Sequence, residues 1–310
     1  MKTRATFLVL LVFTWMMWPG SGRKWAEIFV SEGQNGHAVA RQLKEAGVVR
    51  TPLPFLLWVK FRRAEKRLQV GKYRFAVGRS AFWIVDDLIQ GRTEKVRFVI
   101  PEGFASWQIA DRLDSLKICD GDAFREIVRK ENLEGYLFPA TYELTNGLSP
   151  STVARRFTAE FDARWTPEID ARAKALGLTK LETVTLASIV EREVRVREEL
   201  PLVSAVYHNR LKKKMKLDAD PTVQFALGFW KSRLRNRDYR EAQSPYNTYL
   251  HPGLPPGPIC NPGWDAVLAA LSPASSNALF FVAKEDGRHD FSDTYREHVN
   301  KVNKRNRTQR

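Results

Sequence analysis

A short pattern of strand, glycine turn and helix occurs three times in the first third of this 310-residue chain. Residues 29–33 (Phe-Val-Ser-Glu-Gly) have a counterpart in residues 99–103 (Val-Ile-Pro-Glu-Gly), and a looser copy begins at Gly78. Apolar residues follow at matching distances: Val39, Ala40 and Leu43 in the first copy, Ile109, Ala110 and Leu113 in the second, and Ile84, Val85 and Leu88 in the looser one. Each copy is too small to bury its apolar face alone, so we expect the copies to pack together into one α+β module.

The residues between the copies extend this module. The segment after Pro52 is predicted to begin as a helix and to end in a strand at residues 71–77. As a whole, residues 27–118 resemble in their pattern a small glycan-binding module of the LysM type. The alternative is a spacer that holds a catalytic domain away from a membrane.

An uncharged apolar run, residues 5–19, follows Lys2 and Arg4 at the N-terminus. As a helix it would cover somewhat over ~20 Å, less than the ~30 Å of a bilayer core, so a cleaved signal peptide competes with an uncleaved anchor. Trp15 and Trp18 are bulky where a signal peptidase requires small residues. We therefore favour a transmembrane anchor at residues 5–22, with residues 1–4 in the cytoplasm and the long remainder of the chain outside it.

The chain is strongly basic, with 50 Lys and Arg against 35 Asp and Glu and a net charge of +15. This charge indicates an anionic partner, and nucleic acid, phospholipid and acidic glycan all qualify. Export from the cytoplasm argues against nucleic acid. Residues 301–310 carry five positive charges and no acid, which predicts a flexible basic tail that favours anionic lipid or wall polymer.

The cysteines and histidines give no metal-binding pattern. Cys119 and Cys260 lie far apart and form no CxxC or Cys/His cluster, so they are either one disulfide or two buried thiols. His289 and His298 are close in sequence but lack a third ligand in a standard motif. We therefore predict neither a metal nor a cofactor.

Polar and aromatic clusters, several of which contain proline and glycine, appear after Cys119. They occupy residues 133–142, 220–225, 244–249, 253–263, 280–283 and 289–292. Proline and glycine at this density predict loops, and loops rich in Asn, Thr, Tyr and Asp supply the polar and stacking groups that sugar rings require. We expect these loops to form the walls of a cleft. The alternative for each cluster is ordinary turn chemistry.

Residues 183–194 are predicted to form a helix that faces the core with an apolar stripe. Glu191 and Glu193 lie off opposite edges of that stripe, about 200° apart, so at most one of them works in a cleft. A carboxyl at such an edge is partly desolvated, which raises its pKa and lets it hold a proton near neutrality. The alternative is a solvated helix with i,i+4 ion pairs from Glu191 to Arg195 and from Glu193 to Arg197.

Taken together, the motifs resemble those of the endolytic murein transglycosylases, membrane-anchored bacterial enzymes that cut peptidoglycan strands. The matching segments are residues 134–139, 187–193, 209–211, 220–223, 246–249 and 253–257. By this resemblance Glu191 is the catalytic residue, and Glu193 is either a supporting residue or a salt-bridge partner. The chain departs from the family pattern at Val299, which follows His298 where the family usually has Asn.

The resemblance also implies a chemistry. Glu191 would protonate the glycosidic oxygen that leaves C1 of N-acetylmuramic acid (MurNAc), and its carboxylate would then take the proton of the 6-hydroxyl as that oxygen closes on C1. The product is a 1,6-anhydro end and no water is consumed, so one carboxyl suffices, although a partner could come from Glu134 or Asp220. Substrate-binding roles are implied for Glu134, Asp220, Thr222, Gln224, Tyr246, Asn247, Thr248 and Asn261. The two alternatives are a hydrolytic muramidase and a non-catalytic glycan-binding scaffold.

The predicted architecture is therefore α+β, with the anchor, the LysM-like module and then a mixed α/β catalytic domain at residues 119–300, whose central helix bears Glu191. The resemblance places the protein in the bacterial inner membrane as a single-pass protein with a periplasmic C-terminal part. Its implied partners are peptidoglycan strands, inner-membrane lipid and cell-wall synthases, and its implied role is to terminate nascent strands.

Overall fold

The computed structural model describes residues 24–231 and 234–308, with side chains as far as Arg305. These residues form a mixed α+β fold whose strands pair into two-stranded sheets. Two compact units are distinguished. The N-terminal unit comprises the described residues up to Phe98 with Asp111–Phe124 and Thr141–Val153, and the C-terminal unit comprises the rest. Residues 119–124 and 141–153, which the sequence grouped with the catalytic domain, thus belong to the N-terminal unit.

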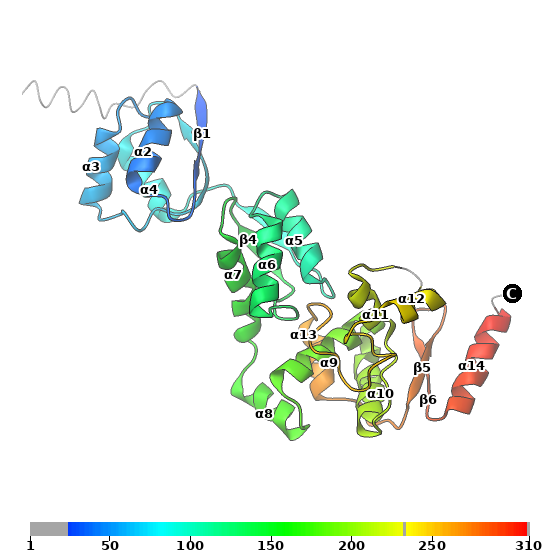
Figure 1. Cartoon of the computed structure of the whole chain (residues 1–310). Helices are drawn as coiled ribbons and strands as arrows, with labels where there is room; N and C mark the ends of the chain where they lie inside the picture. Colours follow the sequence, from blue (N-terminus) through cyan, green and yellow to red (C-terminus); the bar gives the residue numbers. More distant parts are fainter. Residues whose placement is uncertain (1–23, 232–233, 309–310) are drawn as a thin grey trace, which may run out of the picture. The chain divides into compact units, whose positions relative to one another are not determined.

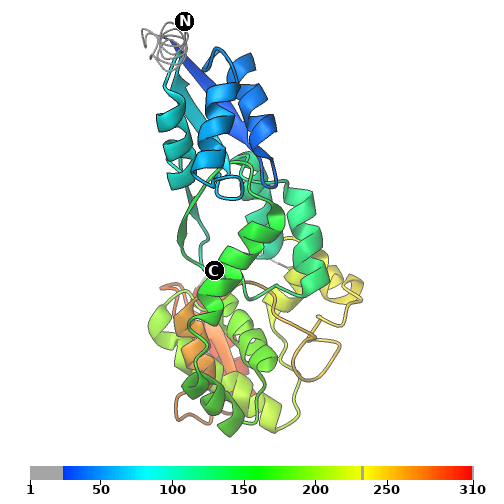
Figure 2. The same cartoon turned by 90° about the vertical axis from the view of Figure 1, so that its left-hand side faces the viewer.

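The core of the N-terminal unit lies between one antiparallel sheet and three helices (Figures 1 and 2). These elements are β1 (Trp25–Val30), α2 (Gly36–Glu45), α3 (Leu53–Phe61), β2 (Gly71–Ala76) and α4 (Ala81–Gln90). The register of the sheet runs from Trp25 opposite Ala76 to Val30 opposite Gly71. Alternate residues of β2 are buried, as expected for a strand with one face on a core. The helix and strand predicted after Pro52 are confirmed as α3 and β2.

The threefold pattern of strand, turn and helix is confirmed. The three turn glycines, Gly33, Gly78 and Gly103, have φ values of 77°, 81° and 76°, a conformation that glycine adopts without steric penalty. The matching apolar residues of all three copies are at most 1% exposed. The expected common core is found only for the first copy and the looser one. In the remaining copy, β3 (Val96–Val99) pairs with β4 (Thr141–Leu144), whose first two residues end the cluster 133–142 that was predicted as a loop.

The elements after β3 are mostly helical. They are α5 (Ser106–Ser115), α6 (Gly121–Glu131), α7 (Pro150–Asp162), α8 (Pro167–Ala175), α9 (Lys180–Glu193), the 3-10 helix η1 (Arg197–Glu199), α10 (Leu200–Lys212), α11 (Asp220–Leu227), α12 (Asn236–Glu241), α13 (Trp264–Leu271), β5 (Phe280–Ala283), β6 (His289–Ser292) and α14 (Tyr295–Thr308). Helix α9 is central to the C-terminal unit, where it packs against α10 and α13 (Figure 1).

Helix α9 is buried on all sides. Every residue from Thr183 to Val190 is at most 1% exposed, so the predicted single apolar stripe is wrong. Its polar residues are accommodated by local bonds, because Thr183 Oγ1 donates to Thr179 O (2.9 Å) and Ser188 Oγ donates to Thr185 O (2.7 Å). The sequence alone does not distinguish buried polar residues of this kind from polar residues that face solvent.

Four segments predicted to be irregular form regular helices or strands. Residues 220–227 form α11, because Pro221 lies in the first turn of a helix, where its missing N–H group is not needed. Residues 280–283 and 289–292 form the hairpin β5–β6. The expected flexible tail is helical as far as Thr308, in α14, which packs on this hairpin (Figure 1).

The predicted anchor at residues 5–22, and the cytoplasmic residues 1–4, lie outside the described residues. Within residues 24–231 and 234–308, no helix has both the length and the apolar character needed to cross a bilayer. Cys119 and Cys260 are free thiols, both buried, so the disulfide alternative is wrong.

Candidate functional site

Helix α9 has sharply defined ends. At its start, Thr179 Oγ1 accepts from Glu182 N (3.1 Å) and Glu182 Oε2 accepts from Thr179 N (2.8 Å), which is a complete capping box. At its end, Val194 is extended, with φ −94° and ψ 131°. The helix therefore stops after Glu193, and Glu191 lies in its last turn.

The Glu191 side chain is 9% exposed, and its carboxyl has specific partners. Its Oε2 accepts a hydrogen bond from Gly263 N (3.0 Å), and its Oε1 lies 3.7 Å from Arg197 Nη1. Burial raises the pKa of Glu191 and the nearby Glu102 carboxylate raises it further, whereas the Gly263 N–H, Arg197 and Arg192 oppose the shift. Such a carboxyl keeps its proton more readily than a solvated one and still has donors to stabilise the anion. It is suited to donate a proton and then to take one back.

The predicted i,i+4 ion pairs are wrong, because the helix ends before Arg195 and Arg197. Glu193 instead accepts from Tyr207 Oη (2.9 Å), and burial raises its pKa to about 7. Arg197 lies in η1, where its guanidinium contacts Glu102, Glu191 and Asp265. The two helix glutamates therefore have separate surroundings, as their angular separation predicted.

Glu134 is held by a network that includes Asn261. Ser106 N lies 3.1 Å from both carboxylate oxygens of Glu134, and Asn261 Nδ2 donates to Glu134 Oε1 (3.2 Å). Asn261 also accepts from Leu137 N through Oδ1 (2.8 Å). Burial raises the pKa of Glu134 to about 7. Because Gly263 follows Asn261 by two residues, one short loop contacts Glu134 through a side chain and Glu191 through a backbone N–H.

A second polar group surrounds Asp220. Its Oδ1 accepts from Tyr239 Oη (3.0 Å) and Tyr249 Oη (2.7 Å). Thr222 and Thr248 hydrogen bond to each other through their hydroxyl oxygens (2.9 Å). This group fixes the start of α11 to the loop after α12.

Four of the predicted substrate-binding side chains are buried and hydrogen bonded internally: Thr222, Asn247, Thr248 and Asn261. Asn247 Nδ2, for example, donates to Tyr239 O (2.9 Å) and Ala242 O (3.0 Å). These contacts favour a loop-forming role for them over direct contact with a ligand. Gln224 and Tyr246 are partly exposed, although Gln224 Oε1 also accepts from Lys231 N (2.8 Å).

An aromatic cluster accompanies these groups: Trp107, Phe225, Trp230 and Tyr246. Trp107 lies 5.3 Å from Phe225 and 5.5 Å from Trp230 between ring centroids, and Phe225 lies 4.8 Å from Tyr246. Arg192 Cζ is 4.0 Å from the centroid of Trp230, so the cluster reaches the residue after Glu191. Sequence reasoning missed Trp107 and Trp230, because isolated tryptophans carry no signal that separates a binding surface from a core.

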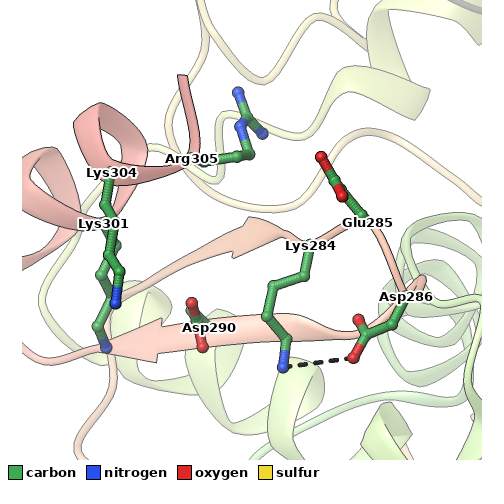
Figure 3. A pocket seen from close by; sticks show the side chains of 7 residues that line it. All are labelled: Lys284, Glu285, Asp286, Asp290, Lys301, Lys304 and Arg305. Atoms are coloured by element: carbon green, nitrogen blue, oxygen red, sulfur yellow. Dashed lines mark ion pairs between the residues drawn. The ribbon is translucent and has the colours of Figure 1, made fainter. Parts of the chain in front are cut away.

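Two of the cavities among the described residues of the C-terminal unit bear on the position of the site. One of 280 Å³ adjoins Arg197 and Asp265 and is otherwise lined by Leu200, Pro201, Leu268, Ala269 and Ser272. Another, of 630 Å³, lies between the β5–β6 hairpin and α14 and has a charged lining of Lys284, Glu285, Asp286, Asp290, Lys301, Lys304 and Arg305 (Figure 3). The larger cavity contains none of the predicted site residues, so we assign the site to the surroundings of Glu191.

The two histidines considered for metal binding have other partners. His289 Nδ1 lies 2.7 Å from Glu199 Oε2, and His298 stacks on Phe280 with centroids 5.4 Å apart. In the part of the chain that the structure describes, no group of three or more His, Cys, Asp or Glu side chains is arranged to hold a metal ion.

The fold and the site define an α+β protein with a helix-borne carboxyl suited to acid–base chemistry, beside polar loops and an aromatic cluster. The chain belongs to the YceG-like family, whose model matches residues 28–304. The resemblance inferred from the motifs is thereby confirmed.

Similar proteins agree with this assignment. Over 300 residues, 87% of this chain and 82% of the relative, the sequence is 31% identical to the endolytic murein transglycosylase of Bacillus subtilis (strain 168). The protein of that name from Streptococcus pneumoniae (strain D39) is 26% identical over 324 residues, 91% of this chain and 58% of the relative. A crystal structure of a YceG-like protein from Listeria monocytogenes matches with a TM-score of 0.58 at 28% identity, covering 89% of this chain and 99% of that one.

Proposed function

We propose that this protein is an endolytic peptidoglycan lytic transglycosylase that cleaves the bond from MurNAc to N-acetylglucosamine and leaves 1,6-anhydro-MurNAc ends. The observation that carries the proposal is the Glu191 side chain, which is 9% exposed and whose carboxyl is bonded to Gly263 N–H at the end of a buried helix. The names of the relatives from Bacillus subtilis and Streptococcus pneumoniae support the same activity and substrate.

The reaction needs one group that acts twice. Protonated Glu191 gives its proton to the glycosidic oxygen as the bond from C1 to that oxygen breaks, and the substrate's own N-acetyl oxygen stabilises the cationic C1. The Glu191 carboxylate, held by Gly263 N–H and Arg197, then takes the proton of the 6-hydroxyl as O6 bonds to C1. The raised pKa of Glu191 supports the first step, and its two donors support the second.

The substrate lies, in this proposal, along the aromatic cluster and the loops beside it. Tyr246 and its neighbours offer ring faces for sugars, and Gln224 offers an amide for N-acetyl groups. Thr222, Asn247, Thr248 and Asn261 shape the walls of the site. Glu134 and Asp220 hold those walls through Ser106 and through Tyr239 and Tyr249.

The test compares Glu191→Gln with Glu193→Gln, a matched change two residues away, on purified cell-wall sacculi. We expect Glu191→Gln to lower the rate by roughly 10²- to 10⁴-fold, the usual contribution of a general acid–base group, and Glu193→Gln to keep most of the activity. Mass spectrometry should show products of the native protein that are lighter by one water than those of a hydrolase. Reducing MurNAc ends would identify a muramidase, and unchanged release by Glu191→Gln would exclude Glu191 as the acid.

We further propose that residues 5–22 anchor the protein in the inner membrane, with the rest in the periplasm, and that residues 27–118 contain the LysM-like glycan-binding module. Exposed aromatic rings support this role for the module, since Phe61 and Trp83 are 74% and 51% exposed and ring faces suit sugars. Anionic membrane lipid and cell-wall synthases are the proposed partners, in a role that terminates nascent strands. The charge of +15 agrees with an anionic partner.

A further inference from the structure

Two carboxylates of the site share one nitrogen of Arg197. Its Nη1 lies 2.5 Å from Glu102 Oε2 and 3.7 Å from Glu191 Oε1. The two carboxylate oxygens are therefore at most about 6 Å apart, close enough for the charge on one carboxyl to change the protonation of the other. Glu102 and Arg197 are 43% and 41% exposed, so both are open to a ligand, whereas Glu191 is mostly covered.

The turn that carries Glu102 is fixed against the Glu191 site by its backbone. Gly103 N donates to Asn261 O (2.9 Å) and Asn261 N donates to Phe104 O (2.8 Å). A side chain on Gly263 would place its Cβ 2.0 Å from Glu102 Oε1, so the Glu102 carboxyl lies directly against the residue whose N–H binds Glu191. Glu102 thus has a defined position, although its side chain is exposed.

The repeat offers a comparison for the position of Glu102. The corresponding residue of the first copy is Glu32, whose carboxylate accepts from Ser149 N (3.0 Å) and from Thr152 Oγ1, near the start of α7. In the second copy the same turn position faces Arg197 and Glu191. The two glutamates occupy equivalent turns and make different contacts.

We propose that Glu102 is the second carboxylate of the active site, and that Glu102 and Arg197 act together as positioning residues that control the protonation of Glu191. This inference rests on the proposed function of Glu191. The charged groups that face Glu191 are Arg192 from α9, Arg197 from η1 and Glu102 from the turn before α5, and the neutral thiol of Cys260 lies nearby. Glu102 favours the protonated acid, and Arg197 favours the carboxylate that follows.

The two residues therefore make opposite predictions. Glu102→Gln removes a negative charge, so the alkaline limb of kcat/KM should move to lower pH by about one unit, the usual effect of one nearby charge. Arg197→Gln removes a positive charge, and the limb should move to higher pH. If Glu102 and Arg197 had only structural roles, both substitutions would lower the rate, but they would not shift the alkaline limb in opposite directions.

The experiment records the pH profile of anhydro-product release by the full chain in detergent. A second readout is the ¹³C NMR titration of the Glu191 carboxyl, whose signal is assigned by its absence in Glu191→Gln. This titration reports the protonation of Glu191 independently of catalytic activity. Glu102→Asp should restore most of the native profile, and Glu198→Gln, an exposed neighbour of Arg197 with the same change in charge, should leave it in place.

The outcomes separate the two proposals. The inference is supported if the two single variants shift both readouts in opposite directions. It also requires the double variant, Glu102→Gln with Arg197→Gln, to have a pH profile near the native one. Unshifted or parallel profiles overturn it, even where the native protein makes anhydro ends. If the native protein makes reducing ends or none, the proposed function fails, and the ¹³C titration still decides whether Glu102 and Arg197 control the proton of Glu191.

Discussion

Three glutamates of the C-terminal unit, Glu134, Glu191 and Glu193, have surroundings that disfavour their ionised form. Burial is the main cause for each, and it raises the pKa of Glu134 and Glu193 to about 7. The pKa of a glutamate in an unfolded chain is about 4.3. Between these two values the folded protein holds protons that the unfolded chain has released, so the free energy of unfolding falls as pH rises through this window.

Glu193→Gln should remove one part of this pH dependence. The amide is neutral at every pH, and its oxygen can still accept from Tyr207 Oη. As the pH rises from 5 to 8, we therefore expect the free energy of unfolding of the variant to increase relative to that of the native protein by on the order of 1–3 kcal/mol. Urea unfolding at several pH values measures the difference. Parallel curves for the two proteins would contradict a raised pKa at Glu193, and the exposed Glu198→Gln serves as the control.

Glu191 is proposed from the sequence as the central residue of the site, but the sequence predicts few of the contacts that Glu191 makes. The helical period separated Glu191 from Glu193, and the family resemblance chose between them. The partners of Glu191 could not be predicted, because Gly263, Arg197 and Glu102 reach it from loops and turns whose long-range contacts leave no local pattern. Glu102 was part of a recognised repeat, and the repeat itself suggested a purely structural turn.

At the scale of an element, the start of α9 is stabilised far from its reacting end. Thr179→Ala removes the side-chain oxygen of the capping box and should lower the free energy of unfolding by about 1 kcal/mol. Thr179→Ser keeps that oxygen and should be close to the native protein. Activity per folded molecule should be unchanged in both variants, since Glu191 lies in the last turn, at the other end of the helix. Lost activity at full stability would show that the cap also affects the site.

The loop that follows Asn261 offers a steric test. Gly263 has a φ of −65°, which any residue adopts, so only the lack of space opposes a side chain there. Gly263→Ala should displace Glu102 and lower kcat/KM by roughly tenfold or more, as misplaced catalytic groups do. Gly36→Ala, whose added Cβ would meet Val59 at an ordinary 3.6 Å, is the matched control. Equal activity of the two variants would contradict a role for the Glu102 position.

Regular elements were predictable where their residues follow a local period. The three copies of strand, turn and helix were found because their buried residues recur at fixed distances. Helix α11 was missed because its proline suggested a loop, although proline suits the first turn of a helix. The hairpin β5–β6 was missed because its short strands are half-buried and carry no clear alternation.

At the scale of the whole molecule, sheet pairing was the least predictable property. The second copy of the repeat, at residues 99–103, places its strand beside residues 141–144, more than forty positions along the chain. Pairing over such a distance depends on the packing of everything between the strands, and no short pattern records it. Local periods therefore predicted the α+β class correctly and overestimated how many copies share one core.

The state of the N-terminus is a property of the full chain and can be measured directly. We expect the protein isolated from bacterial membranes to have the intact mass of 310 residues and to resist a high-salt wash. A version with Trp15→Ala and Trp18→Ala offers the small residues that a signal peptidase requires, and it should be shortened more readily. A soluble native protein that starts near residue 22 would contradict the anchor.

The place where α9 stops has one more effect on Glu191. The backbone carbonyl groups in the final turn of a helix point outward with a combined partial charge of about −0.5. Ionised Glu191 would sit beside that negative pole, so the peptide backbone itself helps to keep the acid uncharged before it reacts. Lengthening the helix by a single turn would move the pole away and make the same glutamate a weaker acid catalyst near neutrality.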